Sequence, residues 1–115
     1  MKSLFCTMTL LTVFIIGCGG GVTTDITGFI ASIFMRGIDH VLIPTTLLSM
    51  VDASVGGKTG VNSNKGKNLI GTFKQPGAII IDPILLKTLN KAHIINGFAE
   101  IIKYGLIFNR NMYET

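Results

Sequence analysis

Short apolar runs bounded by turn residues recur along the first two thirds of the chain, and each predicts a β-strand. Residues 12–16 (TVFII) form a continuous, partly β-branched run, as in a parallel strand that is buried on both faces. Residues 41–43 predict a second short strand, which Pro44 ends. Residues 78–81 predict a third strand, ended by the Asp-Pro pair that follows.

Between these runs the apolar residues recur with the period of a helix. One periodic stretch runs through Phe34, and the threonines and aspartate before it predict a helix that starts near residues 23–25 and ends before Gly37. A second, short helix follows the strand at 41–43. Thr45 or Thr46 can cap it, and its apolar positions include Leu47, Leu48 and Val51.

Strands that alternate with helices predict an α/β layer structure with a parallel sheet. The segment 53–71 contains five glycines and three lysines, which indicates a functional loop or a pair of short loops. Residues 92–108 carry no strand signal, and their apolar positions predict a helix. We therefore place a boundary near 88–91, with a partial α/β domain at 1–89 and the first helix of a second, helical domain at 90–115.

Composition and charge restrict the class of protein. Apolar residues make up 48% of the chain and charged residues 14%, which is too apolar for disorder and lean in charge for a free-standing domain. We expect much of its surface to pack against protein outside the chain. The net charge is +4, but the lysines form no basic helix face, so no nucleic-acid partner is expected. Lys58, Lys65 and Lys67 cluster among glycines and favour a phosphate-bearing small ligand, with ordinary solvated loop lysines as the alternative.

The cysteines and the first residues bear on localisation. Cys6 and Cys18 have no CxxC spacing, which favours a reducing, cytoplasmic compartment. Residues 1–18 also imitate a lipoprotein signal that ends in an acylated cysteine. Cleavage before Cys18 would destroy the predicted strand and glycine turn, and the apolar stretch is shorter than the ~20 residues that a membrane span needs. A cytoplasmic protein without a membrane partner is the preferred interpretation.

Two glycine-rich segments are candidates for binding phosphate. Gly19, Gly20 and Gly21 stand between a predicted strand and a predicted helix, where backbone N–H groups can approach a pyrophosphate. The alternative is a tight turn without a ligand. The segment 56–59 (GGKT) resembles the end of a P-loop, but that motif requires a glycine where the chain has Asp52, and a carboxylate there would repel phosphate. With the P-loop rejected, Asp52 and the nearby lysines form a cradle for an anionic, hydroxylated substrate.

The last predicted helix places three polar residues on one face. Asn96, Glu100 and Lys103 are spaced by four and then three residues, so their side chains line up over about 10 Å of helix axis. A solvated stripe with a Glu–Lys pair is the plain alternative. The neighbouring small residues, among them Gly97, would let another segment approach this helix closely.

Taken together, the motifs of the chain resemble those of the 3-dehydroquinate synthase family. The matching segments are GGGVTTDITGFIAS, FMRG, IPTTLLSMVDASVGGKTGVN, KGKNLIGTFKQP, DPILLKTL and NGFAEIIKYG. The resemblance implies a Rossmann-like, NAD-binding α/β domain followed by an all-helical metal-binding domain, with the active site in the cleft. It also implies that the chain is a central portion of a longer enzyme, truncated at both ends.

The resemblance implies an activity as well. Members of the family convert the seven-carbon keto-acid phosphate DAHP into 3-dehydroquinate and phosphate in the shikimate pathway, as cytoplasmic homodimers with catalytic NAD and a divalent metal, Zn or Co. A sister cyclase such as 2-deoxy-scyllo-inosose synthase is the enzyme alternative. A lipid-anchored or remnant protein without activity is the non-enzyme alternative.

Site residues follow from the same resemblance, position by position. The substrate-binding and catalytic groups are Lys58, Asn68, Asn96 and Lys103, and Arg36 is the arginine donated to the neighbouring subunit's site. Glu100 is the acidic metal ligand, with two histidine ligands expected beyond Thr115. The cofactor-binding residues are Gly19, Gly20, Gly21, Val22, Thr23, Thr24, Asp25, Thr45, Thr46, Asp52, Lys58, Lys67, Leu85, Leu86, Lys87 and Thr88.

Two features depart from the family's pattern. Thr24 replaces a glycine that is common in the family's turn, and we expect this change to tighten the turn and weaken NAD binding. Residues 1–11 match no segment of the family.

Overall fold

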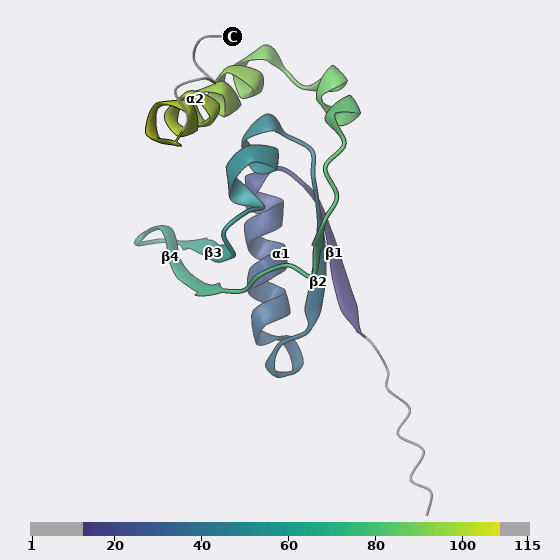
Figure 1. The fold of residues 1–115 in the computed structure, drawn as a ribbon. Helices are drawn as coiled ribbons and strands as arrows, with labels where there is room; N and C mark the ends of the chain where they lie inside the picture. The colour runs from purple at the N-terminus through teal and green to yellow at the C-terminus, as the bar shows by residue number, and fades with distance from the viewer. Residues whose placement is uncertain (1–12, 109–115) are drawn as a thin grey trace, which may run out of the picture.

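The computed structural model describes residues 13–108. Three parallel strands, one β-hairpin and two long helices account for most of these residues (Figure 1). Shorter helical segments follow the first helix, the second strand and the last strand. In chain order the elements are β1 (Phe14–Gly19), α1 (Gly21–Ile33), a 3₁₀ turn (Phe34–Arg36), β2 (Asp39–Pro44), a π-helical segment (Ser49–Ala53), β3 (Lys58–Ser63), β4 (Gly66–Phe73), β5 (Ala78–Ile79), a 3₁₀ helix (Pro83–Thr88) and α2 (Lys91–Phe108).

The parallel sheet has the strand order β1-β2-β5, which confirms the predicted α/β fold. Strand β1 pairs with β2 from Phe14 opposite Asp39 to Gly19 opposite Pro44, so the two carboxyl ends coincide. Helix α1 makes the crossover between them. Strand β5 pairs with β2 over only two residues, because the chain leaves the sheet before the predicted end at Ile81.

Helix α1 lies close against β1 because both elements use small residues where they meet. A Cβ atom at Gly17 would lie 2.3 Å from Oγ1 of Thr27, so only glycine fits the strand there. Thr27 and Ala31 are buried on the same face of the helix. The helix begins at Gly21, before the predicted start at 23–25, because Gly20 rather than a threonine adopts the extended N-cap conformation.

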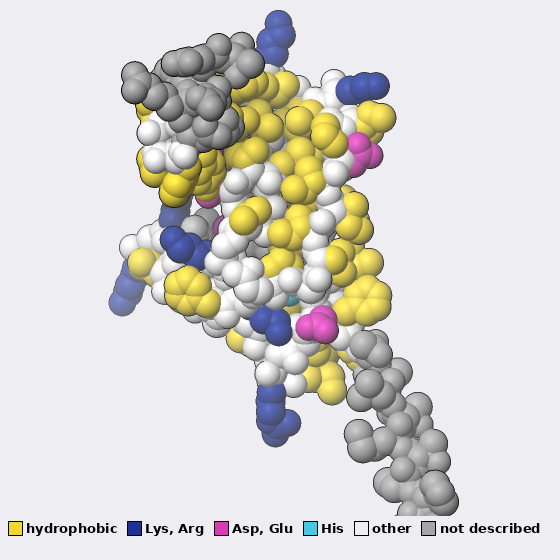
Figure 2. Space-filling view, viewed as in Figure 1, with side chains coloured by type: hydrophobic (Ala, Val, Ile, Leu, Met, Phe, Trp, Pro, Cys, Tyr) yellow, Lys and Arg dark blue, Asp and Glu magenta, His cyan; other side chains and the backbone are white. Residues whose placement is uncertain are grey.

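The sheet is covered by a helix on one face only among residues 13–108 (Figure 1). Phe14 and Ile16 of β1 are 54% and 56% exposed, so the expectation of a strand buried on both faces is wrong for these residues. The apolar pattern of the strand is nevertheless that of a doubly covered one. Figure 2 shows hydrophobic side chains gathered over much of the visible face of the molecule, with lysines and arginines at its edges.

The segment 53–71, predicted to be a functional loop, is largely a β-hairpin. Strands β3 and β4 pair antiparallel, with Lys58 opposite Phe73 and Gly60 opposite Gly71. A Cβ atom at Gly71 would lie 2.1 Å from the carbonyl oxygen of Thr59, so the strands approach too closely for any side chain. The glycines of this segment therefore permit close packing of the two strands. Because glycine is uncommon inside strands, they also made the strand pattern hard to recognise in the sequence.

The hairpin packs on α1 through a chain of hydroxyl groups. Thr59 Oγ1 lies 2.8 Å from Thr72 Oγ1, and Thr72 Oγ1 donates to Ser32 Oγ of the helix at 2.7 Å. Gly28 of α1 lies beneath Thr59, and a Cβ atom at Gly28 would lie 2.4 Å from the Thr59 methyl carbon. These contacts fix the hairpin against the second half of the helix.

Helix α2 confirms the helix predicted at 92–108. The side chain of Asn90 accepts a hydrogen bond from the Ala92 N–H at 2.9 Å and so caps its start. Gly97 lies against Leu47, because a Cβ atom built on the glycine would be 2.6 Å from the Leu47 Cβ atom. This contact confirms that a small residue lets another segment approach the helix. The domain boundary near 88–91 stays a prediction.

Candidate functional site

The glycine turn lies at the carboxyl edge of the parallel sheet, next to the end of β2. The Thr45 N–H donates to the Gly19 carbonyl oxygen at 2.8 Å. A Cβ atom at Gly20 would lie 3.1 Å from the Thr46 methyl carbon. The cofactor-binding residues predicted at 19–21 and at 45–46 are therefore brought together by the pairing of β1 with β2. Ligands of open α/β sheets bind at this edge.

The start of α1 offers donors to an anion. The first N–H groups of an α-helix have no carbonyl partner within the helix, and the helix dipole makes this end partly positive. No side chain caps the start at Gly20. The turn therefore fits the pyrophosphate of a dinucleotide.

Thr24 takes no part in this array of donors. Its side chain is 2% exposed, and its hydroxyl donates to the Gly21 carbonyl oxygen at 2.8 Å. Its N–H donates to the Gly20 carbonyl oxygen at 3.1 Å. Thr24, which replaces the family's glycine, is thus buried and hydrogen-bonded to the helix backbone. It offers a ligand neither its hydroxyl nor its N–H.

Of the two threonines predicted as possible caps, Thr46 caps the short helix that follows β2. The Ser49 N–H donates to Thr46 Oγ1 at 3.2 Å, and the Thr46 N–H donates to Ser49 Oγ at 3.1 Å. This reciprocal pair is the geometry of a capping box, with serine in place of the usual glutamate. It fixes the chain direction after Pro44 and leads into the π-helical segment that carries Asp52.

Two adjoining pockets lie between the first turns of α1 and the hairpin. One measures about 330 Å³ and the other about 400 Å³. They share Asp25, Gly60 and Asn68 in their walls. The first is also lined by Lys58, Thr59, Leu69, Gly71, Thr72 and Phe73, and the second by Val22, Ile26, Val61, Asn62 and Lys67.

Five residues predicted from the sequence therefore meet at these pockets: Val22, Asp25, Lys58, Lys67 and Asn68. Burial raises the pKa of Asp25 above its ordinary value, and the charge of Asp52 raises it further. The two lysines supply positive charge on the hairpin side. The walls combine a carboxyl group with two ammonium groups, which suits a ligand that carries both hydroxyl and phosphate groups.

Asn68 is held in a left-handed backbone conformation, with φ of 53°. Its N–H donates to Asn62 Oδ1 at 3.1 Å. Asparagine tolerates this conformation better than most residues, but it interrupts a regular strand. Such strain is typical of positions that aim a side chain at a ligand, and Asn68 lines both pockets.

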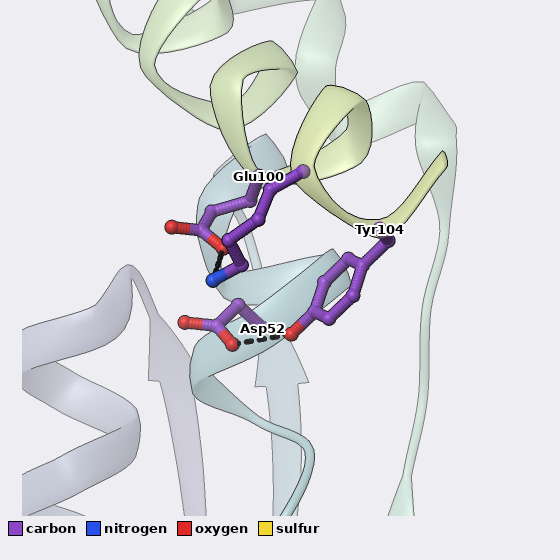
Figure 3. A network of polar contacts seen from close by, with 4 residues as sticks. Asp52, Glu100 and Tyr104 are labelled. Atoms are coloured by element: carbon purple, nitrogen blue, oxygen red, sulfur yellow. Dashed lines mark hydrogen bonds and ion pairs between the residues drawn. The ribbon is translucent and has the colours of Figure 1, made fainter. Parts of the chain in front are cut away.

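Helix α2 lies beside the π-helical segment that carries Asp52 (Figure 3). Glu100 forms an ion pair with Lys103, as the solvated-stripe alternative proposed. The hydrogen bond to Glu100 raises the pKa of Lys103. The hydroxyl of Tyr104 donates to Asp52 Oδ1 at 2.7 Å, which links α2 to the π-helical segment. Tyr104 was not singled out from the sequence, although it lies four residues after Glu100 and so on the same helix face.

Several predicted site residues lie away from the pockets. Asn96 is exposed on α2. Arg36 is exposed and follows the carboxyl end of α1, about 20 Å from the glycine turn for a helix of 13 residues. The 3₁₀ helix with Leu85, Leu86, Lys87 and Thr88 follows β5 and lines neither pocket.

The described part of the chain does not complete a metal site. Among residues 13–108 no group of three His, Cys, Asp or Glu side chains could hold a metal ion. Glu100 is a single carboxylate, and catalytic zinc takes three protein ligands. No described helix is long and apolar enough to cross a membrane. Cys6 lies outside the described residues, whereas Cys18 is exposed within β1.

Comparison with known proteins gives consistent results. A family model described as 3-dehydroquinate synthase N-terminal matches residues 3–96, so the expectation that residues 1–11 match no segment of the family is wrong for residues 3–11. The chain is 58% identical over 100 residues to a 3-dehydroquinate synthase of Prochlorococcus marinus (strain AS9601), which covers 87% of the chain and 28% of that protein. It is 59% identical over 96 residues to the 3-dehydroquinate synthase of Dictyoglomus turgidum, and this match covers 84% of the chain and 27% of that protein. The chain thus spans about 28% of the length of the first of these relatives.

Solved structures of related cyclases share the fold. The 2-epi-5-epi-valiolone synthase of Streptomyces hygroscopicus subsp. jinggangensis, solved with NAD+ and Zn2+, has a TM-score of 0.82 and 44% identity over 86% of this chain and 28% of its own. A 2-deoxy-scyllo-inosose synthase, solved with carbaglucose-6-phosphate, NAD+ and Co2+, has a TM-score of 0.77 and 33% identity over 80% and 25%. The fold and the glycine turn of this chain agree with the family model, and that model covers most of the chain. This chain therefore belongs to the 3-dehydroquinate synthase family.

Proposed function

We propose that the complete gene product containing this chain is a 3-dehydroquinate synthase, which converts DAHP into 3-dehydroquinate and phosphate. The observation that carries the proposal is the meeting of Asp25, Lys58, Lys67 and Asn68 in adjoining pockets beside the start of α1. The identity of 58% to enzymes of that name supports the substrate assignment.

NAD is the proposed cofactor, and the glycine turn fits it. Bound NAD would accept a hydride from a substrate hydroxyl and return it later. The turn at 19–21 and the start of α1 would hold the pyrophosphate, and Thr45, Thr46 and Asp52 would line the adjacent edge. The 3₁₀ helix at 83–88 follows β5, whose carboxyl end faces the same edge of the sheet, and it would supply the remaining predicted contacts.

Lys58 and Asn68 are the proposed substrate-binding groups of the hairpin. A lysine ammonium neutralises a phosphate or carboxylate as a point charge, and an asparagine amide reads hydroxyl groups as donor and acceptor. Lys67 would serve the cofactor side, because it lines the pocket next to Val22. Asn96 and Lys103 would act from α2 once substrate is bound.

Glu100 is proposed as the carboxylate ligand of a divalent metal, Zn or Co. Among residues 13–108 no group of three possible metal-binding side chains forms, so its co-ligands would lie outside the described residues. Within the described residues the Glu100 carboxylate forms an ion pair with Lys103.

We further propose a cytoplasmic homodimer in which Arg36 serves the neighbouring subunit. Arg36 is exposed beyond the carboxyl end of α1 and lines neither pocket of its own chain, which supports this assignment.

The test is an assay of the complete gene product with two substrates. We expect phosphate release from DAHP with catalytic amounts of NAD, and none from glucose 6-phosphate. Release from glucose 6-phosphate alone would assign a sister cyclase activity instead. Absence of NAD binding in equilibrium dialysis would overturn the proposed function altogether.

A further inference from the structure

Helix α2 contacts the segment after β2, residues 47–52, at two points. At the first, Gly97 lies against Leu47 and Leu48, with the Leu48 backbone nitrogen 2.8 Å from a Cβ atom built on the glycine. At the second, the Tyr104 hydroxyl donates to Asp52 Oδ1 at 2.7 Å. The two contacts are seven residues apart on the helix, which is about two turns and hence the same face. The first is a packing contact, and the second is a directional polar one.

Asp52 stands between this helix and the glycine turn. The next residue, Ala53, faces Gly21, with 3.4 Å between its Cβ atom and a Cβ atom built on the glycine. The Asp52 charge also raises the pKa of Asp25, which lines both pockets. The contact thus joins α2 to a carboxylate whose neighbouring residue, Ala53, packs against the glycine turn.

Within residues 13–108 the Tyr104 hydroxyl is the hydrogen-bond partner recorded for the Asp52 side chain. Figure 3 shows one carboxylate oxygen directed at the tyrosine and the other directed away from it. An ionised carboxylate accepts hydrogen bonds only, and it binds a ligand hydroxyl best when its plane is already fixed. A phenol that occupies one oxygen fixes that plane and leaves the other oxygen free.

We propose that Tyr104 is a positioning residue, whose hydroxyl holds the Asp52 carboxylate in the orientation that binds a hydroxyl group of the cofactor. The inference rests on the proposed function, because it takes Asp52 as a cofactor contact. It adds that α2 sets cofactor affinity through one phenol, which contacts Asp52.

The experiment is a double-mutant cycle in the complete gene product, with the dissociation constant of NAD as the readout. The variants are Tyr104→Phe, Asp52→Ala and the pair combined. Tyr104→Phe should weaken NAD binding about tenfold, because a hydrogen bond to a charged group is lost. The same change made in the Asp52→Ala background should alter the dissociation constant less than about twofold, because the tyrosine then has nothing to position.

Phe108→Leu is the matched control. Phe108 stacks on the Tyr104 ring at 6.2 Å between centroids, so this change disturbs the packing of the tyrosine and keeps its hydroxyl. It should leave the dissociation constant of NAD within about twofold of that of the unmodified protein.

Each other outcome contradicts the inference in a recognisable way. If Asp52→Ala weakens NAD binding and Tyr104→Phe does not, or if their effects add, the inference fails and the proposed function stands. Unfolding of Tyr104→Phe under assay conditions would show a structural role and also overturn it. If Asp52→Ala binds NAD normally, or if the unmodified protein binds none, the proposed assignment of the site fails and takes the inference with it.

Discussion

At the scale of single residues, the hairpin lysines separate a ligand-binding role from a solvated one. Lys58 lines a pocket with Asp25 and Asn68, whereas Lys65 lies at the hairpin turn and lines neither pocket. In the complete gene product, Lys58→Met should lower kcat/KM for DAHP more than about tenfold, because a charge that pairs with an anionic substrate is lost. The measurement is steady-state phosphate release.

Lys65→Met is the control for that prediction, since it removes the same charge from the same hairpin. It should change kcat/KM by less than about twofold, as expected for a solvated surface position. Equal effects of the two changes would mean that the hairpin acts through its overall charge and that the assignment of Lys58 is wrong.

His40 gives a residue-scale prediction about pH. The side chain is 1% exposed, and its Nδ1 has no hydrogen-bond partner within residues 13–108. Burial lowers the pKa of His40 below its ordinary 6.5, and the charge of Lys74 lowers it further, against an opposing effect of Asp39. The unfolded chain therefore takes up a proton before the folded one does. Stability is present above pH 6.5 and is lost as the pH falls through the folded pKa.

The check is the midpoint of thermal unfolding of the complete gene product between pH 8 and pH 5. The unmodified protein should lose stability toward pH 5 more steeply than a His40→Phe variant, which fills the same site without a titrating group. Identical slopes for the two proteins would show that protonation of His40 does not oppose folding.

At the scale of elements, the packing of the hairpin on α1 depends on one glycine, Gly28. A Cβ atom at Gly28 would lie 2.4 Å from the Thr59 methyl carbon. Gly28→Ala should cost about 1–3 kcal/mol of unfolding free energy by overpacking, and it should reduce activity by displacing Lys58 and Asn68. Denaturant unfolding measures the first effect and phosphate release the second.

Two further variants make this prediction specific. Thr59→Ser removes the obstructing methyl group and keeps the hydroxyl, so it should recover much of the stability lost in Gly28→Ala. Gly77→Ala is the control, because its Cβ atom would lie at an ordinary 3.6 Å from the His40 carbonyl oxygen. A loss at Gly28 that Thr59→Ser leaves unchanged would locate the strain elsewhere.

Elements with a strong local pattern were predicted, and those made by close backbone contact were not. The strands at 41–43 and 78–81, the helix at 92–108 and the cap at Thr46 follow from periodicity and side-chain chemistry. The hairpin did not follow, because its pairing depends on Gly60 and Gly71 meeting across the strands. A glycine that permits flexibility and a glycine that permits contact look the same in a sequence.

At the scale of the whole molecule, the 115-residue chain by itself should not turn over DAHP. Its described residues offer one proposed metal ligand, and a single carboxylate cannot fix the geometry of a catalytic metal. Phe14, Ile16 and Ile80 are about half exposed, so the isolated chain should also associate in solution. Phosphate release above a metal-only control would contradict the expected lack of turnover. A monomer in sedimentation would contradict the expected association.

The sequence by itself determined the family and the α/β alternation, and it supplied the polar residues that we propose for the site. These depend on local patterns and on motif order, both of which can be read along the chain. Only the tertiary structure decided which of those residues meet. Parallel pairing of β1 with β2 brings Gly19 beside Thr45, and the packing of the hairpin on α1 brings Asp25 to Lys58 and Asn68.

The contact between Tyr104 and Asp52 shows the same limit most clearly. The two residues are 52 positions apart, and no local pattern couples them. Their hydrogen bond exists because Gly97 lets α2 lie against Leu47, which places the next two turns of the helix over the π-helical segment. Side-chain chemistry is written in the sequence, but the distance between two side chains is set by how the elements that carry them pack.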